Sequence, residues 1–211
     1  ETLTFDGIKL DRPPQEITEQ APAVVISYLR RFYEARTTHV LNLEDMRLKS
    51  ICPEILEFVT LHELHLSRNE IDVVPEEISS LGDLRVFTAS GNQLKTLPRE
   101  VRSLRQMEYI DLSNNQINKL PQELGLMADL KELNLANNNL ESLPSDLGKI
   151  PSLTINVDNN GLNFPPKAVT MQGSEVIMKY LRALYVARQS KFLDLSGYGL
   201  QSWPEFVGVK A

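Results

Sequence analysis

Two histidines and a single cysteine are the residues whose types and spacing could support chemistry. His62, Glu63 and His65 resemble a zinc-binding sequence, but their spacing is not that of HExxH. On the β-strand that we expect here, residues 62 and 65 point to opposite faces, so the two imidazoles could not share a metal ion. Cys52 has no histidine near it in the repeat register to activate a thiolate. We therefore expect no metal site, no cofactor and no catalytic site, and a protein that is not an enzyme.

These residues lie in a chain of repeated 23-residue units. Four consecutive units begin at Leu61, Leu84, Met107 and Leu130. In each unit apolar residues occupy positions 1, 4, 6, 11, 14, 18 and 21, asparagine occupies position 9, and proline follows position 14. This spacing is the L-x-x-L-x-L-x-x-N-x-L pattern of leucine-rich repeats. The sequence therefore resembles a leucine-rich repeat protein.

Alternation within the unit predicts its local structure. An x-L-x-L-x segment is typical of a short strand, so we expect Leu64 and Leu66 to point inward and Glu63, His65 and Ser67 to point outward. Strands of successive units would form a parallel sheet on the concave face, and the LPxxLxxL half would close each coil with a short helix or 3-10 turn on the convex face. The predicted fold class is α/β, a curved leucine-rich repeat solenoid with two longer helical units.

Asparagine at position 9 is expected to have a structural role. A side-chain amide can bond the backbone groups that a turn leaves unpaired, and a buried unpaired group costs about 1–3 kcal/mol. The column consists of Asn69, Asn92, Asn115, Asn138 and Asn160. The last interval is 22 residues instead of 23, which predicts a kink or bulge near Leu153.

Two related helical segments flank the regular repeats. The segments that start at Pro13 and Pro165 align without a gap at an offset of 152, through Leu48 and Leu200. Apolar residues at helical spacing predict an amphipathic helix over about Ala23 to Ala35, and a counterpart in the second segment. Their large side chains are expected to pack on the solenoid in preference to forming a docking face: Tyr28, Phe32, Tyr33, Tyr180, Leu184 and Tyr185.

The chain is predicted to be one solenoid over residues 1–211. Its parts are a partial repeat (1–12), a helical insert (13–37), regular repeats (38–164), a second helical insert (165–189) and a partial terminal repeat (190–211). Leu3 and Phe5 fit positions 4 and 6 of a repeat and Leu10 fits position 11, whereas Trp203-Pro204 begins a further repeat. Both ends therefore lack a cap, which predicts either a piece of a longer array or self-association through uncapped ends.

Composition narrows the class of partner and the compartment. The formal net charge of −6 and the sequence pI of about 5.2 argue against nucleic-acid binding. One cysteine, no N-x-S/T sequence and no cysteine-rich cap favour a reducing, cytoplasmic location. No apolar run approaches the roughly 20 residues that span a membrane, and no signal peptide is visible.

The form of the repeat and the second helical segment resemble particular classes of leucine-rich repeat protein. The 23-residue form resembles the intracellular Ras-group leucine-rich repeats, such as Scribble-type scaffolds and Ras suppressor proteins. The PPxxxxxQGxxxIxxYLR segment (Pro165, Pro166, Gln172, Gly173, Ile177, Tyr180, Leu181 and Arg182) is similar to the unit that closes the leucine-rich region of Roco-type GTPases. The first copy departs from it, with Gln20-Ala21-Pro22 in place of Gln172-Gly173-Ser174. The resemblance implies a protein-recognition module, often attached to a GTPase, kinase or scaffold, although this chain contains no GxxxxGK[ST] motif.

The outward strand positions are the predicted binding surface. The candidate partner-binding residues are His65, Arg68, Val86, Thr88, Tyr109, Asp111, Asn134 and Asn156. An exposed aromatic residue in a polar surround, such as Tyr109, is typical of interface anchors. The alternative is that these are only solvated strand residues.

The predicted function is scaffolding: the concave face would bind a protein partner, for example a basic segment or a small GTPase or other signalling protein. Two other functions stay open. The chain could be the regulatory leucine-rich region of a larger signalling protein, a GTPase or kinase, or it could be an architectural spacer or self-assembling array.

Overall fold

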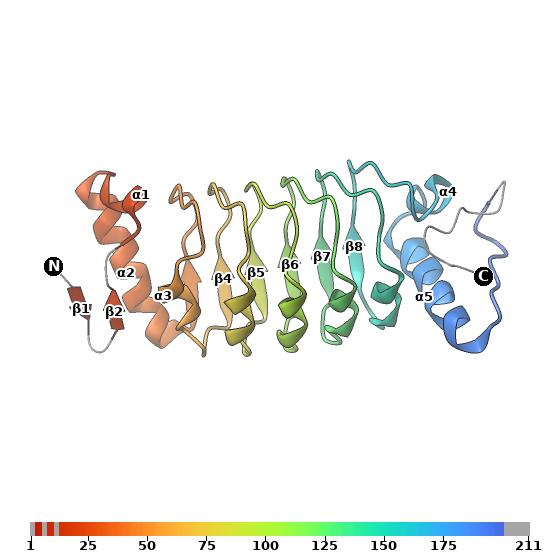
Figure 1. Ribbon diagram of the computed structural model, residues 1–211, viewed down its shortest axis with the longest axis horizontal. Coiled ribbons are helices and arrows are strands. Elements are labelled where there is room, and N and C mark those ends of the chain that lie inside the picture. Colours follow the sequence, from red (N-terminus) through yellow and green to blue (C-terminus); the bar gives the residue numbers. More distant parts are fainter. Residues whose placement is uncertain (1–2, 6–7, 11–12, 201–211) are drawn as a thin grey trace.

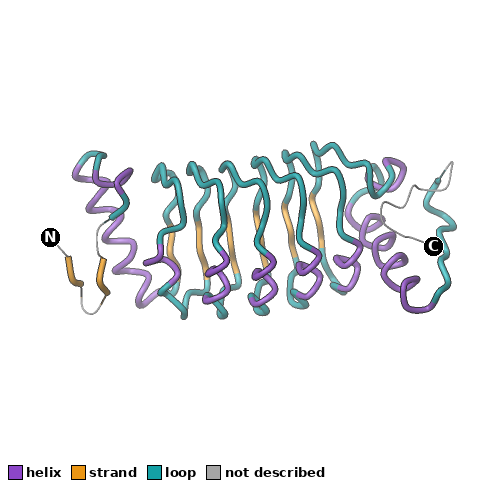
Figure 2. Tube along the Cα trace, in the orientation of Figure 1, coloured by secondary structure: helices purple, strands orange, loops and turns teal. Residues whose placement is uncertain are grey.

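The computed structural model describes residues 3–5, 8–10 and 13–200 of the 211-residue chain. Over this part the chain forms a solenoid whose coils follow one another along the long axis (Figure 1). Each regular coil contributes one strand to a common sheet and one short helix to the opposite side (Figure 2). The predicted fold class, a curved α/β leucine-rich repeat solenoid, is confirmed.

The main sheet has six parallel strands in the order β3 to β8. They are β3 (Val40–Asn42), β4 (Glu63–His65), β5 (Val86–Thr88), β6 (Tyr109–Asp111), β7 (Glu132–Asn134) and β8 (Thr154–Asn156). Each strand pairs with the next at the same repeat position, so Leu64 lies opposite Phe87 and Phe87 opposite Ile110. The inward side chains of the strands are buried, as the alternation predicts.

Short helices close the coils on the convex side. They are α3 (Pro53–Leu56) and the 3-10 helices η1 (Glu76–Ser80), η2 (Arg99–Ser103), η3 (Gln122–Leu126) and η4 (Ser145–Lys149). A proline precedes each 3-10 helix, with φ between −73° and −67°. Its fixed φ and missing N–H suit that place. One apolar side chain from each 3-10 helix, such as Ile78 or Leu124, enters the core.

The strands are shorter than the alternation predicted. Each ends at repeat position 5, and Ser67 at position 7 is only 3% exposed, so the expectation that Ser67 points outward is wrong. The reason is a turn at position 8, where Arg68, Asn114 and Asn137 adopt left-handed backbone angles. The turn carries the preceding side chain inward, where the Ser90 hydroxyl lies 3.1 Å from that of Ser67.

The asparagine column joins neighbouring coils. Asn115 donates from Nδ2 to the carbonyls of Ala89 (2.9 Å) and Leu112 (3.0 Å), and its Oδ1 accepts from the Leu94 amide (3.0 Å). Equivalent bonds recur at Asn69, Asn92, Asn138 and Asn160. The predicted structural role is therefore confirmed, with the addition that each side chain also bonds the coil before its own.

The 22-residue interval is absorbed just before β8. Five residue steps separate Lys149 at the end of η4 from Thr154, whereas six separate Leu126 at the end of η3 from Glu132. Ile150 is extended, with ψ of 119°, where its counterparts have ψ between 57° and 78°. The predicted kink is present, but β8 pairs with β7 in register and has no bulge.

The two helical segments have the same structure at an offset of 152. They comprise α1 (Gln15–Thr18) with α2 (Pro22–Thr38), and α4 (Lys167–Thr170) with α5 (Ser174–Ser190). Both long helices extend three residues beyond the predicted end and stop at a left-handed residue, His39 or Lys191. Neither following coil has asparagine at position 9; instead Gln20 and Gln172 donate from Nε2 to the carbonyls of Met46 (2.9 Å) and Tyr198 (3.2 Å).

The helical segments cover both ends of the six-stranded sheet (Figure 1). Helix α2 packs beside β3, and α5 packs on β8 and η4. The Ser174 hydroxyl accepts a hydrogen bond of 2.8 Å from the Ile155 amide on β8. A helix therefore takes the place of a further coil at each end of this sheet, whereas the uncapped ends expected before α2 and after α5 stay a prediction. The repeat expected from Trp203-Pro204 lies outside the described residues.

The N-terminal strands also differ from expectation. Residues 3–10 were expected to continue the repeat pattern, but β1 (Leu3–Phe5) and β2 (Ile8–Leu10) form an antiparallel hairpin, with Leu3 opposite Leu10. The hairpin is a separate two-stranded sheet. A strand with no parallel neighbour satisfies its backbone groups by pairing with the next segment of its own chain.

The aromatic residues of the helices are divided between core and surface. Tyr28, Phe32 and Tyr180 are buried, as predicted. Tyr185 is half-buried, with the Lys149 ammonium 5.1 Å from its ring centroid. Tyr33 is exposed, which corrects the expectation that it packs on the solenoid. It points away from the coils that follow α2.

We predict that Asn115→Ala lowers the free energy of unfolding by about 2–3 kcal/mol, because it leaves buried carbonyls and an amide of two coils unpaired. Urea unfolding followed by circular dichroism measures the change. The control is Asn118→Ala at an exposed position, which should stay within about 0.5 kcal/mol of the parent. Equal stability of the two variants would contradict the structural role of the column.

We also predict that Gly148→Ala destabilises the protein by about 1–3 kcal/mol, because α5 lies against this glycine. A Cβ at residue 148 would lie 2.5 Å from the Arg182 nitrogen and the Leu181 carbonyl carbon. At Gly82 no atom lies within 4 Å of the corresponding Cβ, so Gly82→Ala is the control and should be tolerated. Thermal unfolding of both variants compares the two sites.

Candidate functional site

The predicted partner-binding residues lie along the strand face of the solenoid. Strands β4 to β8 present repeat positions 3 and 5 outward, and their parallel register sets equivalent side chains in rows across the sheet. Val86 lies beside Tyr109, and Thr88 lies between His65 and Asp111. Arg68 and Asn156 lie on coils separated by three others, so no single small site contains all eight residues.

His65 takes part in a hydrogen-bond chain across two strands. Its Nδ1 lies 3.1 Å from the Thr88 hydroxyl, and its Nε2 lies 3.1 Å from a Glu63 carboxylate oxygen. The ring is therefore held in place by side chains on both sides. His62, the other histidine of the pair, has its ring 5.1 Å from that of His39.

Arg68 is bound to the preceding coil. Its guanidinium donates from Nε and Nη2 to the two oxygens of Asp45, both at 2.8 Å, and from Nη2 to Glu44 at 3.0 Å. This bidentate pairing lowers the pKa of Asp45 below its usual range. A partner carboxylate would have to compete with these two residues, so Arg68 first serves to join coils.

Position 5 has a structural role that sequence reasoning missed. The Oδ1 atoms of Asp111, Asn134 and Asn156 accept bonds of 2.9, 3.2 and 3.0 Å from the amide two residues later. Asn42 and Asp194 make the same turn in the flanking coils. Short side-chain acceptors three residues before a left-handed residue were the available signal. These side chains therefore both shape the turn and line the face.

Tyr109 lies in a shallow hollow of about 330 Å³ on this face. The hollow is lined by His62, Glu63, Arg85, Val86, Glu108, Tyr109, Lys131 and Glu132. Partial burial, together with the carboxylates of Asp111 and Glu132, raises the pKa of the Tyr109 hydroxyl. An aromatic ring with two carboxylates beside it is suited to a cationic side chain.

The hollow is also lined by residues that were not among the predicted partner-binding residues. Position 2 supplies His62, Arg85, Glu108 and Lys131, and the Lys131 ammonium forms an ion pair with Glu108. This pairing lowers the pKa of the Glu108 carboxyl. The recurrence of charged side chains one residue before each strand was the signal that could have identified them.

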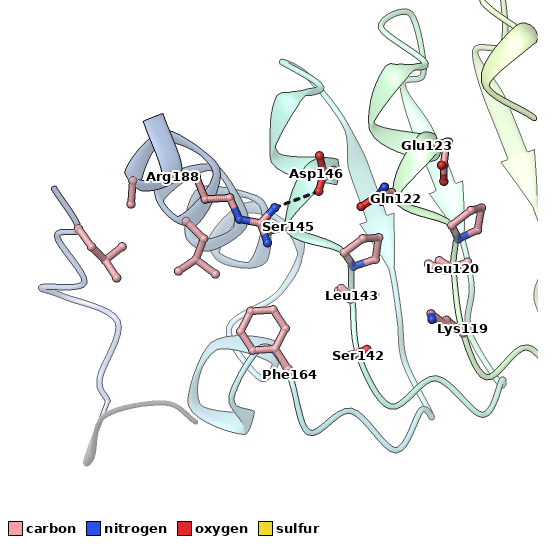
Figure 3. Close-up of a pocket in the computed structure, with 15 residues that line it drawn as sticks. Lys119, Leu120, Gln122, Glu123, Ser142, Leu143, Ser145, Asp146, Phe164 and Arg188 are labelled. Atoms are coloured by element: carbon pink, nitrogen blue, oxygen red, sulfur yellow. Dashed lines mark hydrogen bonds and ion pairs between the residues drawn. The ribbon is translucent and has the colours of Figure 1, made fainter. Parts of the chain in front are cut away.

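A second cavity, of about 690 Å³, lies between η3, η4 and α5 (Figure 3). Phe164, Leu184 and Leu193 give it apolar walls, and the Arg188 guanidinium bonds the Asp146 carboxylate at 3.3 Å beside it. The buried Ser145 hydroxyl, which also lines the cavity, has no hydrogen-bond partner within the described part of the chain. Sequence reasoning missed this cavity because its walls are far apart in the sequence: Arg188 of α5 lies 42 residues after Asp146 of η4.

Cys52 lies in the core beneath α2, not at a surface. Its thiol is 3.3 Å from the Tyr28 hydroxyl, and burial raises its pKa to about 11. The same burial raises the pKa of Tyr28. A thiol that is protonated and enclosed at neutral pH is a poor nucleophile.

Two further structural observations concern metals and membranes. Residues 3–5, 8–10 and 13–200 contain no cluster of three or more histidine, cysteine or carboxylate side chains placed to hold a metal ion. Within the same residues, no helix combines the length and apolar content of a membrane-spanning segment.

The sequence matches two models of the leucine-rich repeat, over residues 60–81 and 105–162. A comparison with curated proteins finds no match. Together with the parallel sheet and the short convex helices, the two matches support a leucine-rich repeat protein. Domains of this kind are typically non-catalytic and commonly mediate protein–protein interaction.

Solved leucine-rich repeat structures resemble the chain. A leucine-rich repeat protein of Leptospira interrogans is 26% identical with a TM-score of 0.52, over 62% of this chain and 40% of that one. The leucine-rich repeat domain of APL1B is 25% identical with a TM-score of 0.56, over 69% and 44%. The ectodomain of the receptor kinase SOBIR1 from Arabidopsis thaliana is 27% identical with a TM-score of 0.51, over 59% and 70%. This chain therefore spans less than half the length of the first two.

We predict that the buried Cys52 makes stability fall at high pH. Because the folded thiol titrates near 11 and the unfolded one near 9, the unfolded state loses its proton first. The stabilisation is complete below about pH 9 and is lost as pH approaches about 11, a change of about 2–3 kcal/mol. Urea unfolding at pH 8 and about pH 10.5 should show a smaller loss for Cys52→Ala than for the parent. Equal losses would contradict the prediction.

Proposed function

We propose that the strand face, which is the concave face of the solenoid, binds a basic segment of a protein partner, with Tyr109 as its anchor. The observation that carries the proposal is the position of the Tyr109 ring in a hollow, with Asp111 and Glu132 close enough to raise the pKa of its hydroxyl. A lysine or arginine on the ring would gain a cation–π contact and the attraction of two carboxylates. The row formed by Val86 and Tyr109 gives the apolar part of the contact.

The remaining candidate residues contribute unequally in this proposal. His65 and Thr88 extend the polar rim beside the hollow, since they already bond each other. Asn134 and Asn156 use their Oδ1 atoms in the turn, so their side-chain NH2 groups would be the ones offered to a partner. Arg68, which is held by two carboxylates of the preceding coil, would mainly keep the edge of the face in shape.

The same proposal includes a cytoplasmic, non-enzymatic scaffold of the Ras-group class with Roco-like helical units. Its supports are the free, buried Cys52 and the absence of N-x-S/T from the sequence, both of which suit a reducing compartment. A regulatory region of a larger signalling protein is the second candidate. The feature that favours it is the similarity of the Pro165 to Arg182 segment to the unit that closes the leucine-rich region of Roco-type GTPases.

We predict that Tyr109→Ala weakens binding of short lysine- and arginine-rich peptides by about tenfold or more, as expected for an aromatic anchor. Asp111→Asn and Glu132→Gln should each weaken it several-fold. Asparagine at residue 111 retains the oxygen that accepts the turn bond, as at Asn134 and Asn156, so the first of these variants removes charge without removing the turn. Fluorescence anisotropy measures the affinities, and the effects of the two charge variants should shrink in high salt.

The matched controls remove one carboxylate each from outside the strand face. Asp72→Asn and Glu77→Gln alter exposed residues, the second of them on η1, and should leave peptide affinity unchanged. Peptides in which glutamate replaces the basic residues should not bind. Unchanged affinity in Tyr109→Ala combined with Glu132→Gln would overturn the proposal, and so would equal binding of the acidic peptides.

A further inference from the structure

The outer face of α2, defined by Ile26, Arg30 and Tyr33, is not covered by any helix or strand of the described residues. These residues are spaced i, i+4 and i+7, so they share one side of the helix, opposite the buried Tyr28 and Phe32. Ile26 and Tyr33 are each 57% exposed. Large apolar side chains that line one face of a helix in this way are typical of an interface.

The equivalent face of α5 is covered, and its contacts indicate what the outer face of α2 could bind. At the offset of 152 its residues are Met178, Arg182 and Tyr185. Met178 is only 6% exposed, and the Tyr185 ring lies under the Lys149 ammonium at 5.1 Å. This side of α5 packs on η4, the 3-10 helix of the last regular coil (Figure 1).

Two features make the contact between α5 and η4 specific. The Arg182 guanidinium donates to the carbonyls of Gly148 (3.3 Å), Ile150 (3.1 Å) and Pro151 (2.7 Å), where the 3-10 turn ends. Gly148 permits close approach, because any Cβ there would lie 2.5 Å from the α5 backbone. This face of α5 therefore fits a 3-10 turn that has a small residue and whose last backbone carbonyls can accept hydrogen bonds from an arginine.

We propose that the outer face of α2 docks a leucine-rich coil of the same type, joined to Pro13 as residues 130–164 are joined to Pro165. Arg30 would bond the turn carbonyls as Arg182 does, and Ile26 and Tyr33 would cover the turn as Met178 and Tyr185 do. This inference does not depend on the proposed binding of basic segments. Its consequence is that α2 is an internal spacer between two arrays of coils.

The N-terminal residues support this occupant. At the same offset Leu3 and Phe5 correspond to Ile155 and Val157, which are buried on the coil that leads to α5. Beside a docked coil, residues 3–5 would form a parallel strand in place of the hairpin. Helix α2 cannot reproduce the Ser174 hydroxyl bond, because Pro22 stands at that position.

A second copy of the chain fits this face less well. Its η4 is already covered by α5, and η1, η2 and η3 each pack on the 3-10 helix that follows. Gly125, the other glycine of a 3-10 helix, lies against Asp146 of the next coil. The described coils of another copy therefore offer no free 3-10 turn with a small residue, which favours a coil joined to Pro13 as the occupant.

A chimera tests the proposal. Residues 107–164 replace residues 1–12 ahead of Pro13, and Tyr33→Cys places a reactive thiol on the outer face of α2. In the unfused chain the introduced thiol should react quickly with a maleimide, since Tyr33 is exposed. In the chimera, burial should slow the reaction by about tenfold or more. The native Cys52 contributes little, because it is buried and its pKa is raised.

Two controls separate docking from general stabilisation. Val73→Cys, at a residue that is 59% exposed, should react equally fast in the fused and unfused chains. Gly148→Leu made only in the transplanted coil should restore fast reaction of the thiol introduced by Tyr33→Cys, because a large side chain would separate the turn from α2. A Tyr33→Cys thiol that remains fast in the folded chimera overturns the proposal.

If the first chimera does not fold, a reciprocal chimera tests whether the outer face of α2 can dock on a 3-10 turn. Residues 13–38 replace residues 165–190, so that the face of α2 is set against η4. A folded protein with a slow thiol at the transplanted Tyr33→Cys position supports the proposal, and an unfolded protein or a fast thiol overturns it. In the unfused chain, a reaction that slows as protein concentration rises would identify a second copy as the occupant and would also overturn it.

Discussion

The structure depends on hydrogen bonds that each coil obtains only from its neighbour. The Asn115 side chain closes its own turn and at the same time bonds the Leu94 amide and the Ala89 carbonyl of the coil before it. Removing a neighbouring coil would therefore leave buried backbone groups unpaired, at a cost of about 1–3 kcal/mol each. For this reason the array cannot be divided into independently stable repeats, and its ends require another element.

The two helical segments meet that requirement in different ways. Where asparagine is missing at position 9, the side chains of Gln20 and Gln172, in the turn before the long helix, bond the backbone carbonyl of the residue at that position, Met46 or Tyr198. Helix α5 also covers η4, with Arg182 bonding the carbonyls at the end of the 3-10 turn. Helix α2 has arginine and tyrosine at the equivalent places, Arg30 and Tyr33, but within the described residues it packs on a coil on one side only. The two helices thus share these residues in different surroundings.

The strand face has a double role that follows from the same constraint. Asp111 shapes the turn that ends β6 and also contributes negative charge beside Tyr109. Arg68 is placed on the face but is held by Glu44 and Asp45. A partner would therefore bind side chains that do not join coils, and Tyr109, whose side chain makes no hydrogen bond within the described residues, is the residue best placed for that contact.

The period of 23, the asparagine column and the 152-residue offset were readable from the sequence, because they arise from local spacing and from backbone groups that every coil must satisfy. They determined the parallel sheet, the inward orientation of the Leu64 side chain and the structural equivalence of α2 and α5. Tertiary structure decided what depends on neighbours. Ser67 is buried because the turn at Arg68 bends the chain inward, and Tyr33 is exposed while Tyr185 is half-buried because only α5 has a coil on its outer side. The hairpin at residues 3–10 has the same cause, since a strand takes whichever partner lies beside it.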